Sequence, residues 1–251
     1  CAKDMMLHMI GRFGMNGGQY QAVEFAGEAV MALNMQERMT LSNMSAEMGA
    51  QAGLIAADDT TCTYLRGVGV SEDALQHAHD WHTDADAACE DFLFDATHLS
   101  PQVAAPHSPA NTRPVHDYAE VPLDVAYIGA CTGAKLEDLR AAAHVLRGHQ
   151  VADGVRLMVA PASARDQAQA EREGVMQTLR DAGAQVLPNS CGACAGYGAT
   201  FAEGDTVISS TARNFKGRMG PVSVQVYLAS PYTVAASALR GRISDPREVL
   251  A

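Results

Sequence analysis

Apolar residues in the first part of this chain recur at the spacing of one face of a helix. This pattern predicts helices over residues 3–14, 21–33 and 41–54. The polar, acidic stretch 72–89 is expected to be a further helix or a loop. The first part of the chain is therefore expected to be rich in helix.

The pattern changes after residue 122 to short apolar runs that alternate with longer amphipathic ones. The amphipathic runs 135–146 and 164–182 predict helices. The short runs predict buried strands over residues 124–128, 156–160, 185–187 and 206–208. Strands that alternate with helices of this length form a parallel sheet with right-handed crossovers. Functional loops then gather at the carboxyl ends of the strands.

Five prolines fall between residues 100 and 122, where neither pattern continues. Proline lacks a backbone donor and restricts the residue before it, so we expect a lobe boundary there rather than regular structure. We predict an α/β fold of two lobes with largely parallel sheets flanked by helices. Residues 1–110 would form a helix-rich lobe, and residues 120–251 would form the lobe that carries most of the candidate chemistry.

Composition adds mainly exclusions to this picture. The 251 residues, 47% of them hydrophobic, can bury one large core or two medium ones. A net charge of −11 disfavours general binding to nucleic acids or anionic membranes, and no apolar stretch reaches the roughly 18 residues of a membrane span. We expect a cytoplasmic protein. Because the chain starts at Cys1, we interpret it as a fragment or as numbered from within a longer chain.

Three cysteines follow predicted strands at their carboxyl ends. Cys131 comes after the strand over 124–128, and Cys191-Gly-Ala-Cys194 follows the strand over 185–187. Glycines around both loops let the backbone wrap closely around a cofactor and offer N–H groups to its sulfur atoms. This arrangement favours an iron–sulfur cluster held by three cysteines, with one iron left open as a Lewis acid for a substrate hydroxyl.

Other interpretations of these cysteines stay open. A C-x-x-C pair also occurs in thioredoxin-like redox sites, in halves of zinc sites and as two buried thiols. A redox pair needs no third thiol, however, and a structural zinc ion needs a fourth ligand. We interpret Cys1, Cys62 and Cys89, which lack a comparable setting, as ordinary buried or free thiols.

Two arginines, Arg213 and Arg218, lie five positions apart on a glycine-containing stretch after the strand predicted over 206–208. Two guanidinium groups suit a substrate with several carboxylates. The alternative is a pair of surface arginines in a solvated turn. Since the stretch follows the next strand after the C-x-x-C loop, we expect it at the same edge of the sheet.

Short motifs stand in a fixed order along the whole chain. They are Ala2-Lys-Asp4, Val23-Glu-Phe-Ala-Gly-Glu28, Asn43-Met44, Leu136-Glu-Asp-Leu-Arg140, Val151-Ala-Asp-Gly-Val155, the two cysteine loops, Arg213-Asn-Phe215, Gly217-Arg-Met-Gly220 and Val226-Tyr-Leu-Ala-Ser-Pro231. In this combination they resemble the large subunits of 3-isopropylmalate dehydratases, in the aconitase superfamily. The resemblance implies an aconitase-like iron–sulfur domain and a hydro-lyase for a small hydroxy di- or tricarboxylic acid, as in leucine biosynthesis.

The resemblance also implies roles for individual residues. Cys131, Cys191 and Cys194 would hold a 4Fe-4S cluster whose unligated iron binds the substrate hydroxyl and a carboxylate.

Arg213 and Arg218 would anchor carboxylates close to that cluster. Asn43 and Glu47 would face the site from the first lobe, with Asn43 binding substrate and Glu47 in a catalytic role. By its sequence alone, Glu47 is a carboxylate on an amphipathic helix, which is more often solvated or capping.

Members of this family carry a further amino-terminal domain with histidine and aspartate site residues, which this sequence does not contain. They take their catalytic serine from a swivelling domain, expected here on a separate small subunit. We therefore expect this chain to hold the cluster and part of the substrate pocket. A small subunit and a hydroxy-acid would be its partners.

The chain departs from the family pattern at three positions near the cysteines and arginines. Gly133 and Ala212 replace asparagines, and Ala193 replaces a proline. The loss of two amides removes donors that orient ligands. Hydratases of citraconate, maleate or homoaconitate therefore stay as alternatives, as does a non-catalytic iron–sulfur binding or regulatory protein.

Overall fold

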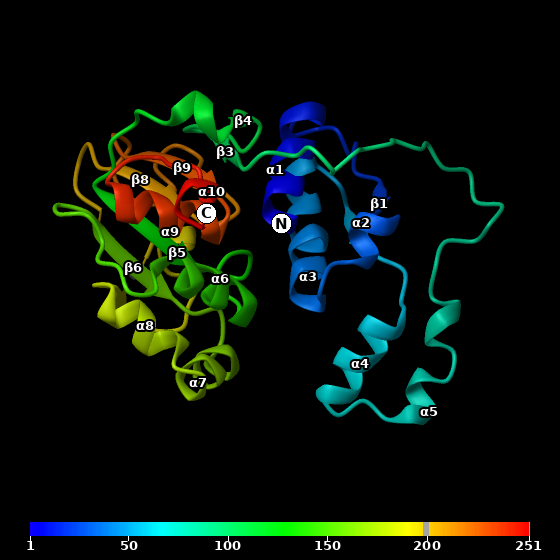
Figure 1. Cartoon of the computed structure of the whole chain (residues 1–251). Helices are drawn as coiled ribbons and strands as arrows, with labels where there is room; N and C mark the ends of the chain where they lie inside the picture. The colour runs from blue at the N-terminus through cyan, green and yellow to red at the C-terminus, as the bar shows by residue number, and fades with distance from the viewer. Residues whose placement is uncertain (198–200, 251) are drawn as a thin grey trace.

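A seven-stranded sheet lies in one half of the computed structural model, on the left in Figure 1, and the structure describes residues 1–197 and 201–250. Its strands are β3 (Gln102–Ala104), β4 (Thr112–Pro114), β5 (Val125–Gly129), β6 (Arg156–Ala160), β7 (Gln185–Val186), β8 (Thr206–Ser209) and β9 (Gln225–Ala229). They lie in the order β4-β3-β9-β8-β5-β6-β7. All pairings from β9 to β7 are parallel, and both pairings of β3 are antiparallel. The predicted α/β fold with a largely parallel sheet is confirmed.

Helices and a small second sheet complete the described part of the chain. The first segment contains α1 (Ala2–Phe13), β1 (Ala22–Glu24), α2 (Glu28–Met31), α3 (Met35–Met44), η1 (Ser45–Met48), β2 (Ala52–Leu54), α4 (Asp59–Gly67), α5 (Glu72–Leu75) and η2 (Ala78–Asp80). Around the large sheet lie η3 (Val115–Tyr118), α6 (Leu136–Leu146), α7 (Ala164–Arg172), α8 (Val175–Asp181), η4 (Gly192–Ala195), α9 (Pro231–Arg240) and α10 (Arg247–Leu250). None of the helices described here is long and apolar enough to cross a membrane.

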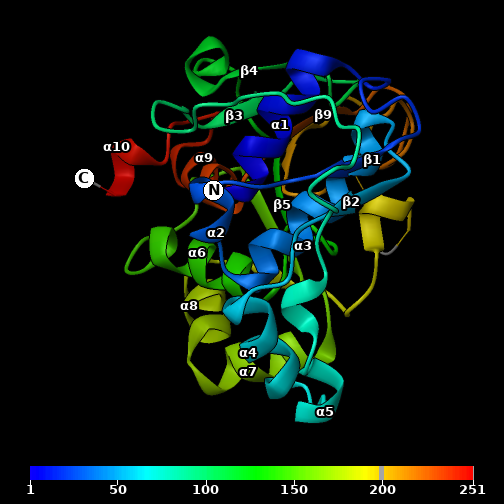
Figure 2. The same cartoon turned by 90° about the vertical axis from the view of Figure 1, so that its right-hand side faces the viewer.

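The two faces of the sheet carry different cores because side chains alternate along each strand. On β5, Ala126 and Ile128 pack among the buried residues of α6, α8 and α9. Val125 and Tyr127 point to the other face, where they join buried residues of α1 and α3. Figure 2 shows α1 and α3 in front of the sheet, seen from the side of the first segment. The core on this second face also includes Ala193 of the C-x-x-C loop.

Arg38 holds the start of α3 in place from a buried position. Its side chain is 2% exposed, and it donates hydrogen bonds to the backbone carbonyls of Leu33 (3.0 Å) and Met31 (3.0 Å). It also donates to both carboxylate oxygens of Asp58 (2.6 and 2.8 Å), which in turn accepts from the Thr61 N–H at the start of α4. One guanidinium thus joins α2, α3 and α4.

The expectation that residues 100–122 lack regular structure is wrong. Strands β3 and β4 form within this stretch, and β3 pairs with β9, so they extend the large sheet. The carboxylate of Asp4 accepts a hydrogen bond from the Gln102 N–H (2.9 Å), which fixes β3 against α1. Prolines did not prevent these strands because each is only three residues long and lies at or near the sheet edge. The division into lobes 1–110 and 120–251 stays a prediction.

Three predicted helices differ from those observed. The stretch 21–33 forms β1, paired in parallel with β2, and the short α2 instead of one helix. The helix expected over 41–54 begins at residue 35 and ends before Gly49, whose left-handed backbone (φ 78°) turns the chain towards β2. The helix expected over 164–182 is divided at Gly174, which is also left-handed (φ 75°).

Candidate functional site

The first cysteine loop starts where β5 ends at the carboxyl edge of the sheet. Ala130 adopts a left-handed backbone (φ 64°), which turns the chain directly before Cys131. The hydroxyl of Ser210 accepts from the Gly129 N–H (3.0 Å) and donates to the Gly133 carbonyl (2.9 Å). A buried serine that follows β8 therefore fixes both ends of the Cys131 loop.

The second cysteine loop returns across β6 to lie beside β5. A Cβ atom at Gly192 would be 2.6 Å from the hydroxyl of Tyr127, which places η4 against the end of β5. Burial raises the pKa of Tyr127 to about 12; the backbone of Ala193 opposes this shift, and charges on Cys194 and Cys191 add to it. The C-x-x-C loop and the Cys131 loop thus meet around one strand.

Arg213 lies between both cysteine loops and the first segment. Its Nε donates to Oε1 of Glu47 in a charge-assisted hydrogen bond that raises the pKa of Arg213. Charges on Cys194 and Cys131 raise it further, so both cysteine loops are within electrostatic reach of the guanidinium. Glu47 itself is 2% exposed, on η1.

Arg218 follows on the same loop, which packs against the C-x-x-C loop. The Arg218 carbonyl oxygen would be 3.0 Å from a Cβ atom at Gly196. Four polar side-chain atoms around this edge are buried without a hydrogen-bond partner in the described residues: Arg218 Nε, Glu47 Oε2, Thr132 Oγ1 and the Tyr127 hydroxyl. Buried polar atoms are normally paired, so these four atoms set this edge of the sheet apart.

Asn43 completes the set of residues selected from the sequence. Its Nδ2 donates to the Sγ of Cys131 (3.5 Å), so α3 contacts the cysteine loop directly. Cys131 and Cys191 are exposed, Cys194 is partly buried, and all three are free thiols. Within the described residues no three His, Cys, Asp or Glu side chains are close enough to hold one metal ion. Cys131 and Cys194 therefore both lie near Arg213, but the three thiols do not converge on one position that a single metal ion could occupy.

Of the other cysteines, Cys62 lies with Leu75 and Ala78 in a small separate core between α4 and α5, and Cys89 is exposed.

Two lysines at this edge were missed by the sequence analysis. Lys3 is 2% exposed, and its Nζ donates to the backbone carbonyls of Ser210 (2.9 Å) and Thr211 (2.6 Å). Burial lowers the pKa of Lys3 to about 8, against a smaller opposing effect of Glu47. Lys135, 7% exposed, donates to the carbonyl of Cys131 (3.2 Å). The sequence could have pointed to them, because Lys3 lies within the motif Ala2-Lys-Asp4 and Lys135 comes directly after the Cys131 loop.

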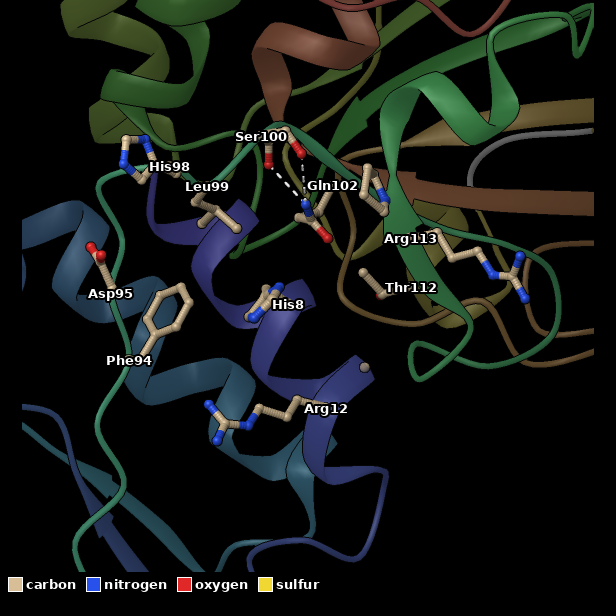
Figure 3. Close-up of a pocket in the computed structure, with 12 residues that line it drawn as sticks. His8, Arg12, Phe94, Asp95, His98, Leu99, Ser100, Gln102, Thr112 and Arg113 are labelled. Carbon is tan, nitrogen blue, oxygen red and sulfur yellow. Dashed lines mark hydrogen bonds between the residues drawn. The ribbon is translucent and has the colours of Figure 1, made fainter.

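A separate cavity lies against α1 (Figure 3). It measures about 630 Å³ and is lined by α1, the stretch 94–102 and β4. His8 stacks on Phe94 at 4.9 Å between ring centroids, and Arg12 and Arg113 contribute positive charge. None of the cysteines lines this cavity, so it is separate from the site at the sheet edge.

Comparison of the sequence with known proteins shows the family of this chain. Residues 1–241 match the aconitase family (aconitate hydratase). The chain is 44% identical over 248 residues to the 3-isopropylmalate dehydratase large subunit of Oleidesulfovibrio alaskensis, covering 98% of this chain and 58% of that protein. It is 42% identical over 253 residues to 3-isopropylmalate dehydratase large subunit 1 of Pyrococcus furiosus, covering 99% of this chain and 58% of that protein. The chain thus spans a little over half the length of these relatives, and it belongs to the aconitase family.

Proposed function

We propose that this chain is the cluster-bearing part of a hydro-lyase that acts on a small hydroxy di- or tricarboxylic acid. The observation that carries the proposal is the meeting of two cysteine loops, two arginines and a buried glutamate at one sheet edge. The relatives that are 42–44% identical to this chain are named 3-isopropylmalate dehydratase large subunits. An isopropylmalate-like acid is therefore the first substrate to test.

Cys131, Cys191 and Cys194 would hold a 4Fe-4S cluster. Their thiols are free, and two of them are exposed. A soft thiolate donor set on glycine-rich loops fits iron–sulfur ligation. When bound, such a cluster supplies a Lewis-acidic iron that has no cysteine ligand.

The remaining residues bind and orient the acid. The guanidinium groups of Arg213 and Arg218 would anchor its carboxylates, because planar forks match carboxylate geometry. Oε1 of Glu47 is held by Arg213, whereas Oε2 has no partner among the described residues. Oε2 would accept a hydrogen bond from the substrate hydroxyl, which is the catalytic role that we propose for Glu47. Asn43 would keep the thiolate of Cys131 in place through its side-chain amide.

The relatives' designation as large subunits supports a small subunit as partner. That partner would carry the swivelling domain with the remaining catalytic group. We further propose that the assembly works in the cytoplasm and that neither nucleic acid nor membrane takes part.

Anaerobic reconstitution of the protein, followed by iron and sulfide analysis and visible spectroscopy, tests the cluster. We expect about four irons and four sulfides per chain. Cys131→Ser, Cys191→Ser and Cys194→Ser should each lose them, whereas Cys62→Ser and Cys89→Ser serve as controls and should keep them.

Retention of the full cluster in Cys191→Ser would overturn the ligand assignment. Bound zinc, or no metal at all in the parent, would overturn the proposed chemistry. With a cluster present, turnover of isopropylmalate by the protein and a small subunit tests the substrate. Turnover of citraconate or homoaconitate but not of isopropylmalate would mean that one of those acids is the substrate. The absence of turnover with every hydroxy-acid would support a binding or regulatory role instead.

A further inference from the structure

One polar face of α3 contacts the second half of the chain at three successive points. Gln36, Thr40 and Asn43 are spaced four and three residues apart, which places them on the same face of a helix. The side chain of Gln36 accepts from the Glu137 N–H at the start of α6 (2.8 Å) and donates to Asp166 of α7 (3.1 Å). Asn43, two turns along, reaches the Sγ of Cys131.

Thr40, between them, meets the ammonium of Lys135, which uses all three of its donors. Lys135 Nζ donates to Thr40 Oγ1 (2.9 Å), to the Cys131 carbonyl (3.2 Å) and to Asp138 Oδ2 (2.8 Å). The three acceptors belong to α3, to the cysteine loop and to α6. A buried ammonium is tolerated only when it is paired and fully hydrogen-bonded, which is the case here.

We propose that Lys135 is a positioning residue that fixes the Cys131 loop between α3 and α6. The part of this inference that concerns the cluster rests on the proposed function. The loop needs such support because Ala130 holds a left-handed backbone (φ 64°), which is unfavourable for a residue with a Cβ atom and persists only where neighbours impose it. The Cys131 carbonyl, next to this strained residue, is the group that Lys135 binds.

The arrangement of the three acceptors requires an ammonium group, so lysine cannot be replaced by arginine at this position. Its three donors point in different directions, as its three acceptors require, whereas the donors of arginine lie in one plane. Lys135→Arg should therefore behave like Lys135→Met rather than like the parent. Thr40→Val keeps the shape of the side chain and removes the acceptor on α3, together with the longer hydrogen bond that the hydroxyl donates to the Gln36 carbonyl (3.3 Å) within the helix. It therefore tests the connection between the two parts of the chain.

The three hydrogen bonds of the Lys135 ammonium are called the clamp below. Hydrogen–deuterium exchange of the cluster-free protein, measured on the peptide 129–135, tests the clamp without any cofactor. Lys135→Met should raise its exchange rate about tenfold or more, and Thr40→Val by a smaller factor. Arg240→Met, an exposed arginine at the end of α9, should exchange like the parent. If Lys135→Met unfolds entirely, Thr40→Val decides. Unchanged exchange in Thr40→Val would then overturn the proposal.

A second readout connects the clamp to the cluster. In reconstituted protein, cluster loss to a chelator, followed by visible absorbance, should be faster in Lys135→Met and Thr40→Val than in Arg240→Met. Faster exchange with unchanged cluster loss would overturn the positioning of Cys131. If the parent takes up no cluster, the proposed function fails, and exchange alone decides whether Lys135 clamps the loop. A cluster in the parent with unchanged exchange in the variants overturns only the clamp.

Discussion

Glu47 and Arg213 form an ion pair although 166 residues separate them in the sequence. The carboxylate is 2% exposed and the guanidinium 40% exposed, so the pair runs from the interior to the open edge of the site. A buried carboxylate needs a partner of opposite charge, and among the described residues Arg213 forms the ion pair with Glu47. The pair therefore connects the stability of the fold to a group that we propose binds substrate.

Arg213→Met should lower the free energy of unfolding by about 1–3 kcal/mol, because it leaves the Glu47 carboxylate buried without its partner. Urea unfolding at one pH measures this change. Arg147→Met, which removes an exposed arginine far from the ion pair, is the matched control and should stay close to the parent. Equal stability of Arg213→Met and Arg147→Met would mean that the ion pair contributes nothing.

Asp58→Asn should destabilise the protein by about 1 kcal/mol at pH 7, a modest value because Asp58 is 33% exposed. Asparagine keeps the cap on α4, so the variant removes the charge and one of the two acceptors that face Arg38. Urea unfolding over a pH series measures the loss, with the exposed Asp153→Asn as control.

The pH dependence of this difference has a definite sign. The hydrogen bonds from Arg38 lower the pKa of Asp58 from 3.8 to about 2. The folded carboxylate thus keeps its charge at pH values where the unfolded one is protonated, and the contribution is present above 3.8 and lost as the pH falls through about 2. Parent and Asp58→Asn should converge across that window. A constant difference would contradict the role of the charge.

Four strands with apolar runs, among them the short edge strand β7, were predicted from the sequence, whereas β9 and the short strands β3 and β4 were not. The strand predicted over 156–160 has the same bounds as β6, because a parallel strand buried on both faces shows one uninterrupted apolar run. By contrast, β3 has only three residues among prolines, and its partner β9 lies more than a hundred positions away. No local pattern can reveal such a strand.

Some residues of the candidate site could likewise be predicted from the sequence, and others could not. Cys131 and the C-x-x-C loop could be found because strand ends and glycines mark them in the sequence. The contacts of Lys3 with Ser210 and of Lys135 with Thr40 join residues 207 and 95 positions apart. A lysine in a sequence is expected to be exposed, and only the folded structure supplies the acceptors that allow these two to be buried.

Gly133→Ala should lower the free energy of unfolding by at least about 1–3 kcal/mol, because there is no room for a side chain. A Cβ atom there would lie 2.2 Å from the Ser210 carbonyl oxygen and 2.4 Å from its Cβ. The glycine that stands in place of the family's asparagine is therefore required by packing in this chain. Gly67→Ala, in a helix with open space around it, is the control and should be neutral or slightly stabilising. Similar thermal midpoints for both variants would contradict this account.

Lys3→Met should destabilise the protein at pH 7 by about 1–3 kcal/mol, because the buried carbonyls of Ser210 and Thr211 lose their donor. The difference should grow with pH. Burial lowers the pKa of Lys3 from 10.5 to about 8, so between these values the unfolded chain holds a proton that the folded chain has released. The parent therefore gains stability over this window, and a methionine cannot. Urea unfolding at pH 7, 8, 9 and 10 measures the change, with the exposed Lys216→Met as control. A gap between parent and Lys3→Met that narrows as the pH rises would show that Lys3 is held in its charged form throughout, with its charge stabilised by the site.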